Sequence, residues 1–308
     1  METTDARLRS FAYAALRRLA DPELPAPGPL ELAGHPLELV AARAALTPGE
    51  TDLLALLVVA EQDDAAQRAL VEHTGDRDRH RVEVGMLAAI LDGSPTLTGP
   101  DSGPVRAGLV EVVPRGAFGR AVLVVAPRLL WALWGDTTQD PALGVGAELL
   151  TADIEETGER DAVLVVGADR VRRRQAAAAA LTAPRLLACA APDTPAAWAA
   201  LVREATLSDT AVLLEVDGAL DAAGRAWVAR ARHLRWALSA PVRLPLDTLP
   251  RRDWVEVEAG DHAPDAAEWA FVLGDDVERT HHLTAAQLDT MGQAMAVTGR
   301  DPAAAYRR

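Results

Sequence analysis

The chain has 308 residues and a formal net charge of −14 at pH 7, which suggests about two globular domains and makes it a poor default binder of nucleic acid. It contains no lysine, so Schiff-base chemistry, a lysine general base and a phosphate-gripping lysine are all excluded. Cys189 is the single cysteine, which excludes an internal disulfide and a thiolate metal cluster. No apolar run approaches the length of about 18 residues that a membrane span needs, and the N-terminus has no apolar signal core, so we expect a cytoplasmic protein without membrane contact.

The first part of the chain predicts helices followed by a β-hairpin. Residues 1–30 predict an N-terminal helix and a linker rich in proline and glycine. The next helix start is the clearest one, because Thr47, Pro48 and Glu50 form a capping-box pattern with proline at the first helical position. Further helical segments precede two short β-rich runs, AGLVEVVP and GRAVLVVAP, which predict a hairpin. We interpret residues 31–150 as a winged-helix-like domain.

The segment RDRHRVEVGMLAAIL is predicted to form the third helix of this domain. DNA recognition would require basic residues on that helix. Arg77, Arg79 and Arg81 are basic, but acidic residues interleave with them. We therefore favour a structural or protein-contacting helix, with these three arginines and Arg170 as candidate partner-binding residues.

A short helix in RLLWALWGD is predicted to close the domain. It carries Trp131 and Trp134 at positions i and i+3, and we expect both indoles to pack in the core. The polar, glycine-containing residues 137–160 predict a linker.

The second half of the chain alternates strands with helices. Apolar runs without polar alternation, separated by helices, indicate a parallel sheet that is covered on both faces. The expected strands are DAVLVVG, RLLACAA, TAVLLEVDG, PVRLPLD and WVEVEAG, and a helix over AAGRAWVARARHLRWALS is expected before the fourth. The fold class is therefore α/β, with a five-stranded core over residues 151–262 and a small helical lid over 263–308.

The first of these strands leads into a turn that resembles a damaged phosphate loop. Such a loop has the pattern G-x-x-x-x-G-K-[ST], in which backbone N–H groups, a lysine and a hydroxyl hold the phosphates and Mg²⁺. Gly167 matches the first glycine, but Arg172, Arg173 and Arg174 replace the second glycine, the lysine and the hydroxyl residue. Arg173 keeps the charge as a bulky planar fork, and Arg174 cannot ligate a metal ion.

The acidic half of a nucleotide site is also out of register. Two adjacent acids are expected at the end of a later strand, but Glu215 is followed by Val216, and Asp217 comes one residue late. Asp247 and Thr248 follow the predicted fourth strand, where a polar sensor residue is expected.

The arginine-rich turn has three interpretations. It is a structural turn that no longer binds a nucleotide, an anion-binding or partner-binding site, or a working nucleotide site. Positive charge at a helix N-terminus is unfavourable, so Asp169 or an acidic partner surface is expected to compensate. For Glu215 and Asp217 the structural alternative is a pair that caps the following helix.

The order of these elements resembles actinobacterial AAA-type ATPases with an N-terminal winged-helix domain, whose relatives accompany contractile injection systems. The matching stretches are LTPGETDLLALLVVAEQDD, RDRHRVEVGMLAAIL, LLWALWGD, LVREATLSDTAVLLEVDGAL and VEVEAGDHAPDAAEWAFVLG, which cover most of residues 30–290. The resemblance implies two tandem ATPase-like domains, of which the first is degenerate and the second would follow Arg308. A family arginine would fall near Glu268 or Trp269, which is a further departure from an active site.

From this resemblance we expect a non-catalytic module that binds proteins and assembles with an ATPase. We expect this module to bind no cofactor. Its expected partners are proteins, including other copies of the chain in a ring. One alternative is a weakly active or nucleotide-binding ATPase that uses ATP and Mg²⁺. Another is a DNA-associated regulator built on the winged helix.

Overall fold

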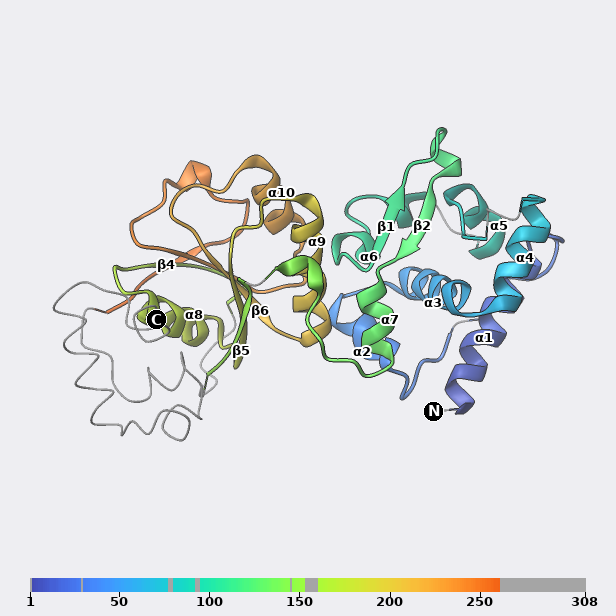
Figure 1. The fold of residues 1–308 in the computed structure, drawn as a ribbon, viewed down its shortest axis with the longest axis horizontal. Coiled ribbons are helices and arrows are strands. Elements are labelled where there is room, and N and C mark those ends of the chain that lie inside the picture. The colour runs from blue at the N-terminus through green and yellow to red at the C-terminus, as the bar shows by residue number, and fades with distance from the viewer. Residues whose placement is uncertain are drawn as a thin grey trace. The chain divides into compact units, whose positions relative to one another are not determined.

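The computed structural model describes residues 2–28, 30–76, 80–91, 95–144, 146–152 and 160–260. Two compact units are formed, one by Met1–Asp140 with Val202–Leu207 and the other by Pro141–Leu201 with Ser208–Arg308. Each unit is described by itself below (Figure 1). The helical lid that was predicted for 263–308, which includes Glu268 and Trp269, lies outside the described residues, as do Arg77 and Arg79.

Helix α3 (Pro48–Gln62) is the central element of the first unit, because every residue from 53 to 60 is buried. The predicted capping box is confirmed. The Thr47 N–H donates to Glu50 Oε2 at 2.8 Å, and the Glu50 N–H donates to Thr47 Oγ1 at 3.4 Å. The other helices of this unit are α1 (Glu2–Arg17), α2 (Pro36–Arg43), α4 (Asp64–Thr74), η1 (Val84–Met86), α5 (Leu87–Leu91), η2 (Pro95–Thr98), α6 (Gly103–Arg106), η3 (Phe118–Arg120) and α7 (Pro127–Leu133).

The predicted hairpin is also confirmed. Strand β1 (Val110–Val113) pairs antiparallel with β2 (Val122–Val125). The preceding helix begins later than predicted, because Glu83 forms a β-bridge with Val122 and the Val82 carbonyl accepts the Leu123 N–H at 3.0 Å. The prediction of a helix from Arg77 onward is therefore wrong at least for residues 81–83. The buried β-branched residue Val82 fits an extended segment better.

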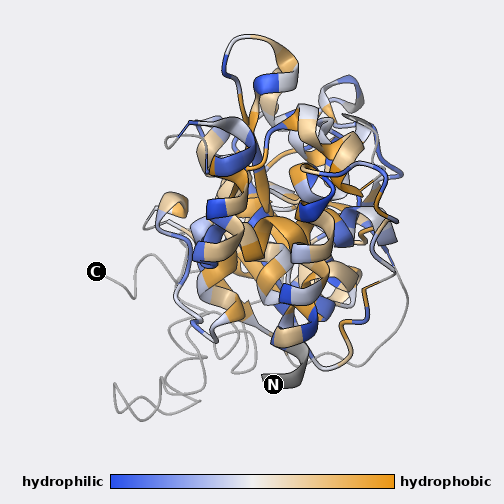
Figure 2. Ribbon diagram, turned by 90° about the vertical axis from the view of Figure 1, so that its right-hand side faces the viewer, coloured by the Kyte–Doolittle hydropathy of each residue, from blue (hydrophilic) through white to orange (hydrophobic). Residues whose placement is uncertain are grey.

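The core of the first unit contains mainly leucine, valine and alanine. Figure 2 shows hydrophobic residues along the inner segments of its helices and hydrophilic residues toward the outer turns. Trp134 does not follow this pattern, because 68% of its surface is exposed at the end of α7. The prediction that Trp134 packs in the core is therefore wrong, because α7 ends at Leu133 and Trp134 is its C-cap residue.

The second unit contains a mixed sheet of six strands in the order β3-β5-β6-β7-β4-β8. All neighbouring pairs are parallel except β3–β5, which is antiparallel. Figure 1 shows α8 on one side of this sheet and α9 and α10 on the other, as right-handed crossovers require. The elements of this unit begin with η4 (Pro141–Leu143) and continue with β3 (Glu148–Thr151), β4 (Ala162–Val166), α8 (Arg170–Leu181), β5 (Arg185–Ala190), α9 (Pro195–Ser208), β6 (Ala211–Glu215), α10 (Ala222–Arg230), β7 (Trp236–Ala240), η5 (Leu246–Thr248) and β8 (Val255–Glu258). Residues Val202–Leu207 of α9 are grouped with the first unit.

Two expectations about this sheet are wrong. The region predicted as a linker contains β3, which adds an antiparallel edge strand to the five parallel strands. The fourth parallel strand is β7, whose five residues are all buried, and not the predicted segment 241–247. Pro241 and Pro245 disfavour that segment as a central strand, since a proline cannot donate a ladder hydrogen bond. The helix predicted over 222–239 consequently ends at Arg230.

Helix α8 packs closely on the sheet through small and branched residues. Its Val171, Ala177 and Leu181 belong to one buried cluster with Val163 and Val165 of β4. Alanine has no side chain beyond Cβ, so Ala177 and Ala178 let the helix lie close to the strands. This packing brings the first turn of α8 to the carboxyl ends of the parallel strands.

Candidate functional site

The turn between β4 and α8 is shaped by Gly167. A Cβ on this residue would lie 2.9 Å from Ala259 Cβ and 3.3 Å from the Ala259 carbonyl oxygen. The Ala259 N–H donates to the Val166 carbonyl at 2.8 Å, so the end of β8 is held against the turn. Gly167 has no positive φ. The glycine is therefore needed for close packing between β4 and β8.

Replacing Gly167 by alanine is expected to lower the free energy of unfolding by about 1–3 kcal/mol, because the new methyl group overpacks against Ala259. Urea denaturation measures the change. Gly218→Ala is the matched control, since a Cβ at Gly218 would meet nothing within 4 Å. Adding Ala259→Gly should recover most of the loss; a Gly167→Ala protein as stable as the control would contradict this packing role.

The N-terminus of α8 is already capped by a carboxylate. Asp169 Oδ1 accepts the N–H of Val171 at 2.7 Å and the N–H of Arg172 at 3.1 Å. Backbone N–H groups at a helix start are the usual ligands of a phosphate. Here two of them are occupied by Asp169, whose negative charge also suits the helix dipole.

The four arginines at the start of α8, Arg170, Arg172, Arg173 and Arg174, are called the arginine cluster below. Arg170 and Arg174 lie one helical turn apart, and both form forked hydrogen bonds with Glu215 at the end of β6. Arg170 Nε and Nη2 donate to Glu215 Oε1 and Oε2 at 2.8 and 2.5 Å. Arg174 Nε and Nη2 donate to the same two oxygens at 2.7 and 3.0 Å. A single carboxylate is thus shared by two guanidinium groups.

Arg174 also links this pair to the edge strand. Its Nη1 donates to Glu148 Oε2 at 2.9 Å, and only 1% of the Arg174 side chain is exposed. Glu148 begins β3, and β3 runs antiparallel to its neighbour, so its first residue reaches the same edge as the carboxyl ends of the other strands. The strand that the sequence did not predict therefore supplies one acid of the network.

Arg173, which stands at the lysine position of the phosphate-loop pattern, is hydrogen-bonded to the chain itself. Its Nε donates to Ser239 Oγ at 2.8 Å, and its Nη1 donates to the carbonyl oxygens of Gly167 at 2.6 Å and Ala168 at 3.0 Å. Ser239 is fully buried in β7. Only 7% of Arg173 is exposed, so this guanidinium is directed inward.

Arg172 completes the connection with the last strand. Its Nη1 donates to the Gly260 carbonyl oxygen, two residues after β8, at 2.6 Å. The arginine cluster thus contacts the ends of β3, β4, β6, β7 and β8. In an open α/β sheet, the usual ligand crevice lies between two neighbouring strands whose following connections run toward opposite edges of the sheet. Strands β4 and β7 are such a pair, because β4 leads to β5 and β7 leads to β8. In this chain, arginine side chains hydrogen-bond across that edge.

The charges of the network stabilise one another. Burial alone would raise the pKa of Glu215, but the hydrogen bonds and positive charges of Arg170 and Arg174 lower it to about 2. Burial likewise would lower the pKa of Arg174, whereas the Glu215 carboxylate raises it. Burial, with a smaller contribution from Glu215, raises the pKa of the Cys189 thiol to about 12, which fits an inert buried thiol.

The remaining residues singled out from the sequence lie elsewhere. Asp217 is exposed after β6, and Asp247 and Thr248 lie in η5, where the Thr248 hydroxyl donates to the Pro245 carbonyl at 2.6 Å. Asp221, and neither Glu215 nor Asp217, caps α10. Arg81 Nε pairs with Glu61 Oε1 at 3.0 Å. Arg170, a candidate for partner binding, is engaged with Glu215.

Ser239 was missed by the sequence reasoning because the fourth strand was misplaced. The buried run WALSA, followed by PVRLPLD with its two prolines, was the signal that could have placed this strand correctly. Glu148 was missed because β3 has only four residues and lies next to glycine-containing segments.

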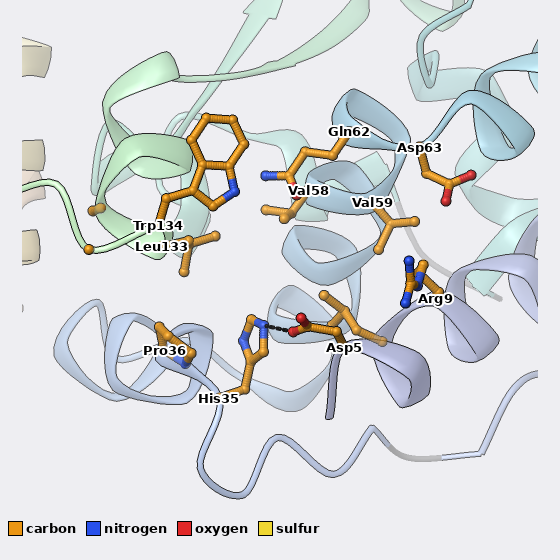
Figure 3. A pocket seen from close by; sticks show the side chains of 13 residues that line it. Asp5, Arg9, His35, Pro36, Val58, Val59, Gln62, Asp63, Leu133 and Trp134 are labelled. Carbon is orange, nitrogen blue, oxygen red and sulfur yellow. Dashed lines mark ion pairs between the residues drawn. The ribbon is translucent and has the colours of Figure 1, made fainter. Parts of the chain in front are cut away.

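A second candidate site is a pocket of about 550 Å³ in the first unit (Figure 3). Its walls come from α1, α2, α3 and the end of α7. Figure 3 shows Trp134 facing the pocket from one side and the contact between Asp5 and His35 at the other. The lining residues are Asp5, Leu8, Arg9, His35, Pro36, Val58, Val59, Gln62, Asp63, Ala132, Leu133, Trp134 and Gly135. Apolar walls with a few polar groups are typical of ligand pockets.

Comparison of the chain with protein-family models, with curated proteins and with solved structures found no match. Within the described ranges, no group of three or more His, Cys, Asp or Glu side chains could hold a metal ion. None of the described helices is both long enough and apolar enough to cross a membrane.

Proposed function

We propose that this chain is a non-catalytic, protein-binding module of an AAA-type ATPase assembly, in which the nucleotide-binding scaffold is retained but its phosphate site is closed by the chain's own arginines. A second candidate is a nucleotide-binding ATPase domain, and a third is a DNA-associated regulator.

The strand order supports an AAA-type core. Numbered along the chain from β4 to β8, the five parallel strands lie in the order 5-1-4-3-2. The strand before the Gly167 turn thus lies between the fourth and the fifth, at the crevice where an open α/β sheet usually binds its ligand. In the first unit, helices α2 to α5 followed by the β1–β2 hairpin favour a winged-helix-like domain.

The observation that carries the proposal is that each guanidinium group of the arginine cluster already has a hydrogen-bond partner within the chain. Every one of its four guanidinium groups donates to a carboxylate, a hydroxyl or a carbonyl of the same chain. A triphosphate would have to take Arg170 and Arg174 from Glu215, and breaking a buried ion pair costs about 3–5 kcal/mol. The two helix-start N–H groups taken by Asp169 would also have to be released. These residues do not fit a magnesium-bound triphosphate.

Exposed apolar side chains support the protein-binding part of the proposal. Trp134, Phe118 and Leu39 of the first unit expose 68%, 61% and 59% of their surface. Aromatic side chains are enriched in protein–protein interfaces. The net charge of −14 and the pairing of Arg81 with Glu61 argue against DNA as the partner.

Calorimetric titration with a non-hydrolysable ATP analogue and with ADP, each with Mg²⁺, tests the proposal. We expect no binding with either nucleotide, and we expect any self-association to be independent of added nucleotide. A Kd in the micromolar range would contradict the proposal and favour the second candidate. A duplex-DNA complex that survives physiological ionic strength would favour the third.

A further inference from the structure

We propose that the pocket of the first unit binds an arginine side chain of a partner protein, with the guanidinium between the Asp5 carboxylate and the exposed ring of Trp134. This proposal goes beyond the proposed function and does not depend on the AAA-type assignment, because all the lining residues belong to the first unit.

The Asp5 carboxylate is the acceptor of this site. Its Oδ1 lies 3.3 Å from His35 Nε2, and 49% of the Asp5 side chain is exposed. His35 Nδ1 accepts the Leu37 N–H at 3.0 Å as the cap of α2, so the hydrogen of the neutral ring is on Nε2, the nitrogen that lies nearer Asp5. The neutral His35 ring therefore leaves the negative charge of Asp5 for a ligand.

The other charges of the pocket largely offset one another. Figure 3 shows Arg9 and Asp63 on the side of the pocket away from Trp134 and Pro36. Asp63 is already engaged, because its oxygens accept from Tyr13 Oη at 2.8 Å and from the N–H groups of Ala65 and Ala66 at 2.8 and 3.0 Å. Arg9 lies close enough to contribute to the lowered pKa of Asp63, although burial of Asp63 acts in the opposite direction. Asp5 is left as the charge that faces the Trp134 half.

The apolar walls suit the stem of the ligand. Val58 and Val59 of α3 lie behind the pocket, and Trp134 exposes its indole at the rim. A guanidinium stacks favourably on an indole face and pairs with a carboxylate, while its three methylene groups need apolar contacts. The volume of about 550 Å³ is sufficient for such a side chain with its adjoining backbone.

The test uses N-acetyl-arginine methylamide, with the citrulline compound as its neutral isostere and the glutamate compound as the anion. Binding to the full chain is followed by NMR through the indole N–H signal of Trp134, which the variant Trp134→Phe assigns. We expect the arginine compound to bind about tenfold more tightly than the citrulline compound, and the glutamate compound not to bind. Equal binding of the three compounds, or binding of none, would overturn the proposal.

Two variants locate the interaction. Asp5→Asn keeps an oxygen that can accept from His35 Nε2 but removes the charge, so we expect about a tenfold loss of affinity for the arginine compound and little change for citrulline. Trp134→Ala should weaken both compounds. Asp101→Asn, an exposed acid of the same unit outside the pocket, is the control. If the Asp5→Asn protein binds the arginine compound as tightly as the Asp101→Asn control does, the proposal is overturned. The proposal is also overturned if tetramethylammonium binds as tightly as the arginine compound, because the ligand would then be a small free cation and not a partner side chain.

Discussion

Replacing Glu215 by glutamine is expected to lower the free energy of unfolding by about 3–5 kcal/mol, because the buried Arg174 guanidinium and the partly exposed Arg170 guanidinium lose their shared carboxylate. Glutamine has nearly the same shape but no charge, so the loss reports electrostatics and hydrogen bonding. Urea denaturation followed by tryptophan fluorescence measures the change. The effect is large because only 1% of the Arg174 side chain is exposed and water cannot replace the lost partner.

The matched control for this variant is Asp217→Asn, which removes an exposed acid two residues along the chain. Its expected effect is within about 0.5 kcal/mol. The variant Arg174→Met, alone and combined with Glu215→Gln, completes a double-mutant cycle, in which the two substitutions should be strongly non-additive. A Glu215→Gln protein as stable as the control would mean that the arginine cluster does not hold the strand ends together.

Acidification is expected to remove the same stabilisation. The pKa of Glu215 is about 2 in the folded protein against an ordinary value of 4.5. A carboxyl whose pKa is lowered by folding stabilises the protein above its unfolded pKa, and this contribution is lost as the pH falls from about 4.5 toward 2. The difference of about 2.5 units corresponds to roughly 3 kcal/mol.

Comparing wild type with Glu215→Gln over this pH range isolates the contribution of Glu215 from that of other carboxylates. The stability difference between the two proteins should be constant above about pH 5 and should shrink as the pH falls toward 2, where wild-type Glu215 also becomes neutral. Arg170 and Arg174 stay charged throughout this range. A difference that does not change with pH would refute the lowered pKa and its assignment to the two arginines.

The network gives a physical reason for four arginines at a helix start, where positive charge is unfavourable. Asp169 neutralises the helix N-terminus, and Glu215 and Glu148 take the charge of Arg170 and Arg174. The arginine cluster thereby joins the ends of several strands. The same contacts occupy the edge of the sheet where a nucleotide would bind.

Much of the fold followed from local patterns. The capping box at Thr47, the hairpin β1–β2 and the strands β4, β5, β6 and β8 were predicted from apolar runs and turn signals, and the structure confirms them. These features depend on neighbours in the sequence. The local pattern likewise predicted that Gly167 follows a strand and that Arg172, Arg173 and Arg174 lie at the start of the next helix.

The remainder depends on contacts between distant segments. The pairing of β3 with β5 determines that Glu148 reaches Arg174, and a four-residue strand carries too little pattern to predict this. Strand β7 was hard to predict because its five apolar or small residues directly follow an arginine-rich segment that itself predicts a helix. The pocket in the first unit combines Asp5 of α1 with His35 and Trp134, which cap α2 and α7, so only tertiary structure brings them together.

The central claim, that the arginine cluster closes the phosphate site, is tested most directly by unfolding the wild-type protein with and without magnesium and ATP. A ligand that binds the folded state and is present at about 100 times its Kd raises the free energy of unfolding by about 2.7 kcal/mol. Our account predicts the same free energy of unfolding in both conditions at millimolar nucleotide. A stabilisation of that size, lost in the variant Arg173→Gln, would contradict it.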